Sequence, residues 1–387
     1  MGLSKSSASL MVPYVSAFLT QMSLSVAFIT TPILAYLMDA SPFLIGLIGA
    51  STGATYAAMT RVFGSISDRF SRKKLLFTSE VVQALSMVVC YLSQDPYQLI
   101  VSRLVFAFGA ALFWPLVIAY IGDLAEADHL GQALAGYNVS WSSATVIGPQ
   151  LGGLLIVWLP IRTPFLVACA VLFFTSTLLF LGTRAHIDKS RHVIHPAESA
   201  EPVRADSTVF PLIHAFLVAF TAATLSAIFP AYATQLRVSA DQIGLMFLLS
   251  GLTQTLTVLL ASRLQSTLGE GTMLLLSSFL LLCSLAMIGL ILTVQLFLVS
   301  FTIFGLGQGL AYSTAIFSVL KGSGTRRGKA AGVFESTLGV GFFMGPLVGG
   351  ILYQLGGSYP YFFGAFLSLW ILITHLFMKL RRVHTND

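Results

Sequence analysis

Long apolar runs alternate with short polar segments along the whole chain. A helix needs about 20 mostly apolar residues to cross a bilayer, so each run predicts one membrane-spanning helix. The runs of the first half cover residues 10–37, 43–65, 75–93, 97–121, 131–158 and 164–183. Those of the second half cover residues 210–235, 242–263, 272–293, 296–320, 329–354 and 360–379. The pattern predicts an all-α membrane protein with twelve transmembrane helices.

One polar segment, residues 184–208, is much longer than the others. It carries eight charged residues and three irregularly spaced histidines, a composition that favours a solvated linker over a metal site. We interpret it as a cytoplasmic linker between an N-terminal half, residues 1–183, and a C-terminal half, residues 209–387.

The two halves repeat one another at an interval of about 198 residues. Six spans return the chain to the side of the membrane on which it began, so the two six-helix repeats are predicted to be parallel. Three motifs carry the repeat: Ile45-Gly46 recurs as Ile243-Gly244, Gly109 recurs as Gly307, and Gly148-Pro149 recurs as Gly345-Pro346.

Composition and charge support this interpretation. Charged residues make up 9% of the chain and the mean hydropathy is +0.85, whereas soluble proteins carry about 25% charged residues. Of the 21 lysines and arginines, two lie inside predicted spans and two in loops on one side, while the remaining 17 lie on the other side. Because cytoplasmic loops are rich in these residues, both termini are predicted to be cytoplasmic. This distribution explains the net charge of +6 without nucleic-acid binding.

The densest charged segment lies between the second and third spans, at residues 64–74, and reads Gly-Ser-Ile-Ser-Asp-Arg-Phe-Ser-Arg-Lys-Lys. A basic cytoplasmic loop by itself requires neither the glycine nor the acid. The pattern resembles the loop signature of the major facilitator superfamily, although Ser71 stands where the family usually has glycine. The matching residues are Gly64, Asp68, Arg69, Arg72 and Lys73.

The resemblance covers essentially the whole chain. It implies that spans 1, 4, 7 and 10 line a central cavity and that spans 2, 5, 8 and 11 form the seam between the halves. It also implies that Asp68 docks on the start of span 11 in the outward-open state, where a helix N-terminus favours an anion. Asp123, just past span 4, resembles the acidic partner of the basic loop. The second-half counterpart, near Arg263 to Gly271, keeps little of the signature, which predicts an asymmetric gate.

Spans 5 and 11 each carry small residues on one helix face, which lets helix backbones approach closely in lipid. A proline in each motif permits a bend. The span 5 motif resembles the signature of the twelve-span drug:proton antiporter branch, with alanine in place of its first glycine. Either the faces only pack, or they form a bending seam on which the halves rock. The residues are Ala144, Gly148, Pro149, Gly152, Gly341, Gly345, Pro346 and Gly349.

Charges inside spans are costly and by default indicate function. Arg61, Glu80 and Glu335 lie at similar depth, near the cytoplasmic ends of spans 2, 3 and 11. We expect Arg61 to pair with Glu335 when the cytoplasmic side is closed. The alternative is that these long side chains reach out to the interface.

Arg103 lies inside span 4 and resembles the family's span-four arginine, which is associated with proton coupling. An unpaired guanidinium is unfavourable there, so we expect it to face the cavity, water or a polar group of span 1 such as Gln21. The alternative is a structural tie within the bundle.

A buried carboxylate can take up and release a proton as a site opens and closes. No acid lies in the middle of spans 1, 4, 7 or 10, so Asp68, Glu80 and Glu335 are the acidic candidates. His214 in span 7 is a further candidate, but we expect it to be a hydrogen-bonded interior histidine rather than a relay.

The four cavity spans are rich in aromatic and weakly polar residues. A large wall of this kind suits amphipathic or aromatic solutes better than sugars or phosphates. The cavity candidates are Gln21, Phe28, Trp114, Phe220 and Tyr312.

These observations predict a secondary active transporter that exports hydrophobic or amphipathic small molecules of the multidrug type, with the proton as coupling ion and no cofactor or metal. One alternative is a transporter of a specific metabolite, such as a sugar, an amino-acid derivative or a siderophore, working in export or uptake. Another is a membrane receptor or scaffold without transport. An enzyme is not expected, because no nucleophile–base pair appears. We expect a monomer in the bacterial cytoplasmic membrane, with a small-molecule substrate and the lipid bilayer as partners.

Overall fold

The computed structural model describes residues 5–66, 71–126, 129–182, 209–290, 292–322 and 327–384. Within these ranges it describes the backbone alone at residues 5–8, 61–62, 64–66, 322, 327–329, 331 and 378–384. The predicted linker and the loop residues Asp68 and Arg69 lie outside the described residues.

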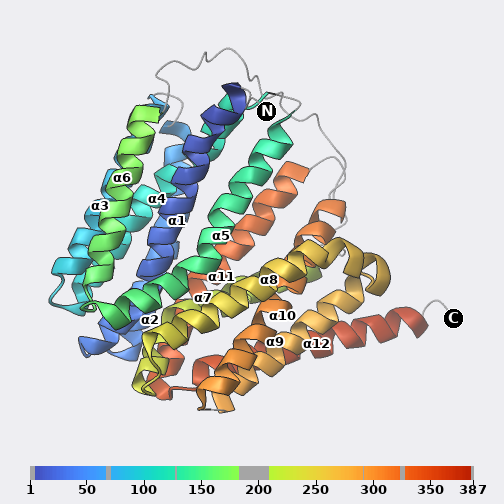
Figure 1. Cartoon of the computed structure of the whole chain (residues 1–387). Helices are drawn as coiled ribbons and strands as arrows, with labels where there is room; N and C mark the ends of the chain where they lie inside the picture. The colour runs from blue at the N-terminus through green and yellow to red at the C-terminus, as the bar shows by residue number, and fades with distance from the viewer. Residues whose placement is uncertain are drawn as a thin grey trace. The chain divides into compact units, whose positions relative to one another are not determined.

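The first half consists of six helices, with their order along the chain following the predicted apolar runs. They are α1 (Lys5–Leu37), α2 (Pro42–Ile66), α3 (Arg72–Leu92), α4 (Pro96–Leu124), α5 (Leu130–Trp158) and α6 (Thr163–Gly182). α1 packs against α4, α5 and α6, and α3 packs against α4 and α6 (Figure 1). α2 packs against α4. The first half is therefore a bundle in which α4 packs against α1, α2 and α3.

The second half repeats this arrangement. Its helices are α7 (Val209–Gln235), α8 (Ala240–Leu268), α9 (Glu270–Leu290), α10 (Val294–Gly322), α11 (Arg327–Leu355) and α12 (Tyr359–His384). α7 packs against α10 and α11, as α1 packs against α4 and α5. α9 packs against α10 and α12, as α3 packs against α4 and α6.

Local sequence explains where α4 begins. The side chain of Asp95 accepts a hydrogen bond from the backbone N–H of Tyr97 at 2.7 Å, and Pro96 occupies the first turn. A carboxylate at the N-cap satisfies a free N–H group, and a proline in the first turn loses no helical hydrogen bond. These residues fix where α4 begins, and therefore how far Arg103 lies from its first turn.

The predicted all-α fold with twelve helices is confirmed in the described residues. Eleven of these helices contain a stretch long and apolar enough to cross a membrane. The remaining one, α5, has 29 residues, which is also long enough, but Gln150 and the serines at 142 and 143 make it less apolar. Contacts within the chain define two compact units, Met1–Ile194 with Ser239–Gly244, and His195–Val238 with Leu245–Asp387.

Candidate functional site

An ion pair joins the start of α3 to the end of α4. The Nη1 atom of Arg72 lies 2.6 Å from Oδ2 of Asp123. The sequence analysis expected Asp123 to meet the basic loop, and the structure brings it to this member of the loop signature. Next to Arg72, the Lys73 ammonium lies 4.4 Å from the ring centre of Phe180 in α6, within cation–π range. Both basic residues thus hold the start of α3 against neighbouring helices.

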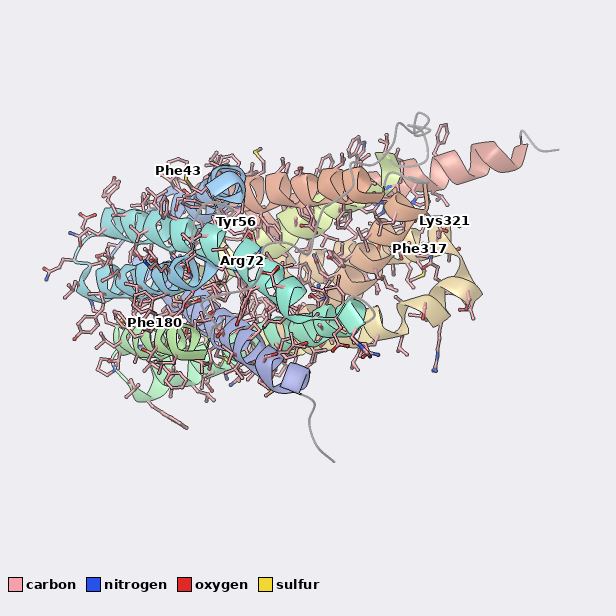
Figure 2. The ribbon with its side chains drawn as sticks, turned by 90° about the horizontal axis from the view of Figure 1, so that it is seen from above. Phe43, Tyr56, Arg72, Phe180, Phe317 and Lys321 are labelled. Atoms are coloured by element: carbon pink, nitrogen blue, oxygen red, sulfur yellow. The ribbon has the colours of Figure 1, made fainter. Side chains whose placement is uncertain are left out.

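A second ion pair stands at the corresponding place in the second half. Nζ of Lys321, at the end of α10, lies 2.6 Å from Oε1 of Glu270, at the start of α9. The Ser318 hydroxyl donates to the other carboxylate oxygen at 2.8 Å. Lys321 also extends past the ring of Phe317, one turn earlier in α10, with 5.7 Å between Nζ and the ring centre (Figure 2).

The second-half pair lies at the segment near Arg263 to Gly271, which keeps little of the loop signature. The charged contact is kept there, but acid and base are exchanged: Glu270 follows Arg72 by 198 residues, and Lys321 follows Asp123 by the same interval. The loop signature is defined by residue types, so it does not reveal this pair. The 198-residue interval, applied position by position, does reveal it.

Arg103 is almost completely buried, with 2% of its surface exposed. Its Nη2 atom donates to the backbone oxygen of Ala27 at 3.3 Å and to the hydroxyl of Thr31, both on α1. Nε and Nη1 have no hydrogen-bond partner among the described residues. The expected partner on span 1 was Gln21, but Gln21 donates to Ser25 within α1 at 3.4 Å. The arginine therefore ties α4 to α1 through a different turn of α1.

The second half replaces this polar tie by an aromatic one. Phe301 and Phe229 are the repeat equivalents of Arg103 and Thr31. Their rings are 4.6 Å apart, centre to centre, so α10 and α7 meet through the same positions. In the second half, the first and fourth helices of the repeat thus meet at these positions without a charge. We therefore expect Arg103 to have a role besides joining α1 and α4.

Glu80 is fully buried in α3. The Thr20 hydroxyl of α1 donates to its Oε1 atom at 2.7 Å, whereas Oε2 finds no hydrogen-bond partner in the described part of the chain. The alternative that this side chain reaches out to the interface is therefore wrong for Glu80. Thr20 is not among the candidates recognised from the sequence, because sequence alone does not show which face of α1 meets α3.

His214 lies in the interior of the second half. Its Nδ1 atom is 3.0 Å from the backbone oxygen of Phe210, and Nε2 is 3.1 Å from the hydroxyl of Ser278 on α9. A carbonyl oxygen can only accept, so in the neutral ring Nδ1 carries the proton and Nε2 accepts from Ser278. This is the arrangement expected for an interior histidine. The ring also lies 5.9 Å from that of His375 in α12.

The predicted pair of Arg61 and Glu335 stays a prediction. The side chain of Arg61 lies outside the described residues, and Glu335 is an exposed residue of α11.

Several small residues of α5 and α11 pack against α1 and α7, respectively. A side chain at Gly148 would meet Ser25 of α1, and one at Gly345 would meet the backbone oxygen of Phe220 in α7. A methyl group at Gly152 would likewise lie 3.1 Å from the Cα atom of Val26 in α1. The faces therefore let α1 and α7 approach α5 and α11 closely, as the packing alternative expected, while a bending seam between the halves stays a prediction.

The five predicted cavity residues differ in exposure. Phe28 is 38% exposed, Gln21, Trp114 and Tyr312 are half-buried, and Phe220 is only 3% exposed. Phe220 packs beside the rings of neighbouring residues in α7 and α12, so it does not offer an open wall in this structure.

Comparison with known families and proteins agrees with the helical repeat. The family model described as Major Facilitator Superfamily matches residues 14–222 and 212–386. Multidrug resistance protein 2 of Bacillus subtilis is 26% identical over 365 residues, covering 89% of this chain and 90% of that protein. The proton-coupled antiporter flippase LtaA of Staphylococcus epidermidis is 24% identical over 344 residues, covering 84% of this chain and 83% of that protein.

A more local similarity and two solved structures complete the comparison. The uncharacterized MFS-type transporter YfiS of Bacillus subtilis is 30% identical over 150 residues, which is 39% of this chain and 36% of YfiS. The crystal structure of the nucleoside transporter NupG superposes with a TM-score of 0.73 at 14% identity, covering 96% of this chain and 98% of NupG. A bacterial homologue of the iron transporter ferroportin gives 0.75 at 12% identity, covering 95% and 98%. Identities this low show the fold alone.

Proposed function

Because the chain belongs to the Major Facilitator Superfamily, we propose that this membrane transporter exports hydrophobic or amphipathic small molecules in exchange for protons. The chain is a transporter and not an enzyme, as its family indicates. The proposed cycle is alternating access, in which the two halves expose a substrate site to one side of the membrane at a time.

One observation carries the choice of substrate class: many of the polar side chains on the predicted cavity helices use their hydrogen bonds within the bundle. In α1, the hydroxyls of Ser23 and Thr30 donate to carbonyl groups of the same helix. Thr224 of α7 and Ser313 of α10 do the same. Gln308 of α10 donates its amide to α7. A solute would therefore meet mainly aromatic and aliphatic surface, which suits amphipathic compounds.

The relatives support the same proposal over most of their length. Two of them carry the names of a multidrug resistance protein and a proton-coupled antiporter. Arg103, which resembles the span-four arginine associated with proton coupling, lies buried with two nitrogens unpartnered among the described residues. A charge held inside a span at this cost supports a role in moving a proton or gating its path.

We place both termini in the cytoplasm of a bacterial cell, because 17 of the 21 basic residues lie on that side of the predicted spans. The basic loop then faces the cytoplasm, and the Arg72–Asp123 pair anchors its end to α4. Asp68 would complete the gate by docking on span 11. The functional unit is a monomer in the inner membrane.

Inside-out vesicles carrying an imposed proton gradient test this proposal. A panel of hydrophobic amines, neutral aromatic compounds, nucleosides and sugars is added, and collapse of the gradient is followed by a pH-sensitive dye. Collapse with the hydrophobic amines or aromatic compounds supports proton-coupled export. Collapse with a sugar or nucleoside alone would replace it by transport of a specific metabolite.

The Asp68→Asn variant is the control for the gate. It should reach the membrane at wild-type amounts and lose the response. A well-expressed variant with full activity would remove Asp68 from the mechanism, and no response of the wild-type protein to any compound would contradict proton-coupled drug export.

A further inference from the structure

The contact between Glu80 and Thr20 joins a buried acid of α3 to a helix of the predicted cavity. Glu80 has no exposed surface, and neither has Thr20. One carboxylate oxygen accepts the Thr20 hydroxyl at 2.7 Å, and the other has no hydrogen-bond partner among the described residues. Burying an ionised carboxylate with one oxygen unbonded costs much free energy, whereas burying the neutral acid costs far less.

The charged groups on the helices around Glu80 lie away from it, towards either end of α3. Towards one end, the exposed Lys74 is six residues away, about 9 Å along the helix, Lys73 lies over the ring of Phe180, and Arg72, eight residues away, is paired with Asp123. Towards the other end, α4 brings Arg103 to the level of Cys90, since the adjacent Ser102 contacts Cys90 at 2.8 Å. That level is ten residues, about 15 Å, beyond Glu80.

The remaining neighbours of α3 add no charge. The described part of α6 carries no acidic or basic side chain, and its one titratable residue is Cys169. In α1, the titratable residues whose side chains are described are tyrosines, and the Tyr14 hydroxyl donates to the backbone of Ala133 in α5. No described cation therefore faces Glu80 to compensate its negative charge.

A proton bound to Glu80 would match the hydrogen-bonding groups around its carboxyl group. The neutral acid gains one O–H donor on the oxygen that now lacks a partner. Gln83 stands three residues later on the same face of α3, is fully buried, and its Oε1 atom also has no partner among the described residues. The side-chain amide of Gln83 donates to Ser79 at 3.3 Å, which leaves that oxygen free to accept.

We propose that Glu80 is the site in the first half at which the transported proton binds, with Thr20 as the positioning residue that connects its charge state to α1. This inference rests on the proposed proton-coupled transport. Protonation removes the charge that makes the Thr20 bond strong, so α1 is held less firmly against α3 when Glu80 is neutral. Release of the proton restores the charge-assisted bond and draws α1 back.

The second half provides a comparison. The repeat equivalent of Glu80 is Ser278, which bonds to His214 of α7. Both halves thus keep a buried polar contact between the first and third helices of the repeat, but a carboxyl group occupies this position only in the first half. Packing can be satisfied at this position without an acid.

The direct test is labelling of the purified full-length protein with a hydrophobic carbodiimide, which reacts with protonated carboxyl groups in apolar surroundings. Mass spectrometry then locates the modified residue over a series of pH values. We expect modification of Glu80 that declines as the pH rises and that is absent in Glu80→Gln. Absence of modification at Glu80 at every pH would overturn the proposal, and this measurement needs neither a substrate nor a variant that folds.

Transport provides the second readout. In proteoliposomes, Glu80→Gln should lose uptake driven by a proton gradient and keep exchange of substrate at equal concentrations, which requires no net proton movement. Asp241→Asn, in the first turn of α8, is the matched control and should keep both activities. Full gradient-driven uptake by Glu80→Gln would contradict the proposal. Labelling of Glu80 without any proton flux in the wild type would instead count against proton-coupled transport itself.

Discussion

Arg72 and Glu270 occupy the same position in the two repeats, carry opposite charges, and each binds the oppositely charged residue 51 positions later. An ion pair requires opposite signs but does not require that a given helix supply the acid. The helix dipole, however, distinguishes the two arrangements. Glu270 at the start of α9 and Lys321 at the end of α10 are placed as the dipole favours, whereas Arg72 and Asp123 are placed against it.

We therefore expect the first-half pair to be the weaker of the two. Such dipole contributions are typically about 0.3–1 kcal/mol for a surface charge, and both pairs are partly exposed. A weaker contact at the basic loop would suit the gate that we propose there.

Exchanging the residues of each pair tests this difference. Arg72→Glu with Asp123→Arg should raise the melting temperature of the purified protein, because both charges then agree with the helix dipoles. Glu270→Arg with Lys321→Glu should lower it for the opposite reason. The two shifts should shrink together in concentrated salt, which screens exposed charges. Equal melting temperatures for the two exchanged proteins at low salt would rule out the dipole as the cause.

Gly345 should be intolerant of a side chain. A methyl group there would run into the backbone oxygen of Phe220, which cannot move without moving α7. Gly345→Ala should therefore lower stability by about 1–3 kcal/mol. Gly339, in the same helix, has no described neighbour within 4 Å, so Gly339→Ala should be neutral or slightly stabilising through its better helix propensity. Thermal unfolding of the two variants in one detergent makes the comparison, and similar losses in both would contradict tight packing of α7 on α11.

Thr31→Val should lower the stability of the protein more than Thr30→Val. Thr31→Val keeps the shape but removes the hydroxyl partner of the buried Arg103 guanidinium, a loss of about 1.5–3 kcal/mol for a hydrogen bond to a charged group. Thr30→Val is the matched control, because the Thr30 hydroxyl donates only within α1. Melting temperatures should fall clearly for the first variant and little for the second. Thr31→Ser, which keeps the hydroxyl, should recover most of the loss.

His214 should contribute to stability and not to proton transfer. Both ring nitrogens are hydrogen-bonded in the neutral state, so the ring needs no further proton to satisfy its surroundings. The His214→Gln variant should keep the wild-type dependence of transport on pH, with a reduced melting temperature. Removal of the partner, in Ser278→Ala, should reduce stability by about 1 kcal/mol and also leave that pH dependence unchanged. A shifted pH profile in either variant would identify the histidine as a proton carrier.

Some site residues could be recognised from sequence because their chemistry is unusual for their location. Glu80 and Arg103 stand out as charges within apolar runs, whatever their partners. The partners could not be recognised in the same way. Thr20 and Thr31 resemble the other hydroxyl residues of α1, and only the rotation of α1 about its axis selects them over Gln21.

By itself, the sequence determined that twelve helices form two similar halves. A bilayer leaves no free backbone hydrogen-bonding groups unpaired, so apolar runs of this length must be helical, and the interval of about 198 residues shows that the pattern occurs twice. Only the tertiary structure decided which side chains meet: the two ion pairs, the aromatic contact in place of the Arg103 tie, and the contact of Glu80 with Thr20. The residue exchanges can be read at the repeat interval, but these contacts join helices that are distant in the chain and depend on helix rotation and packing.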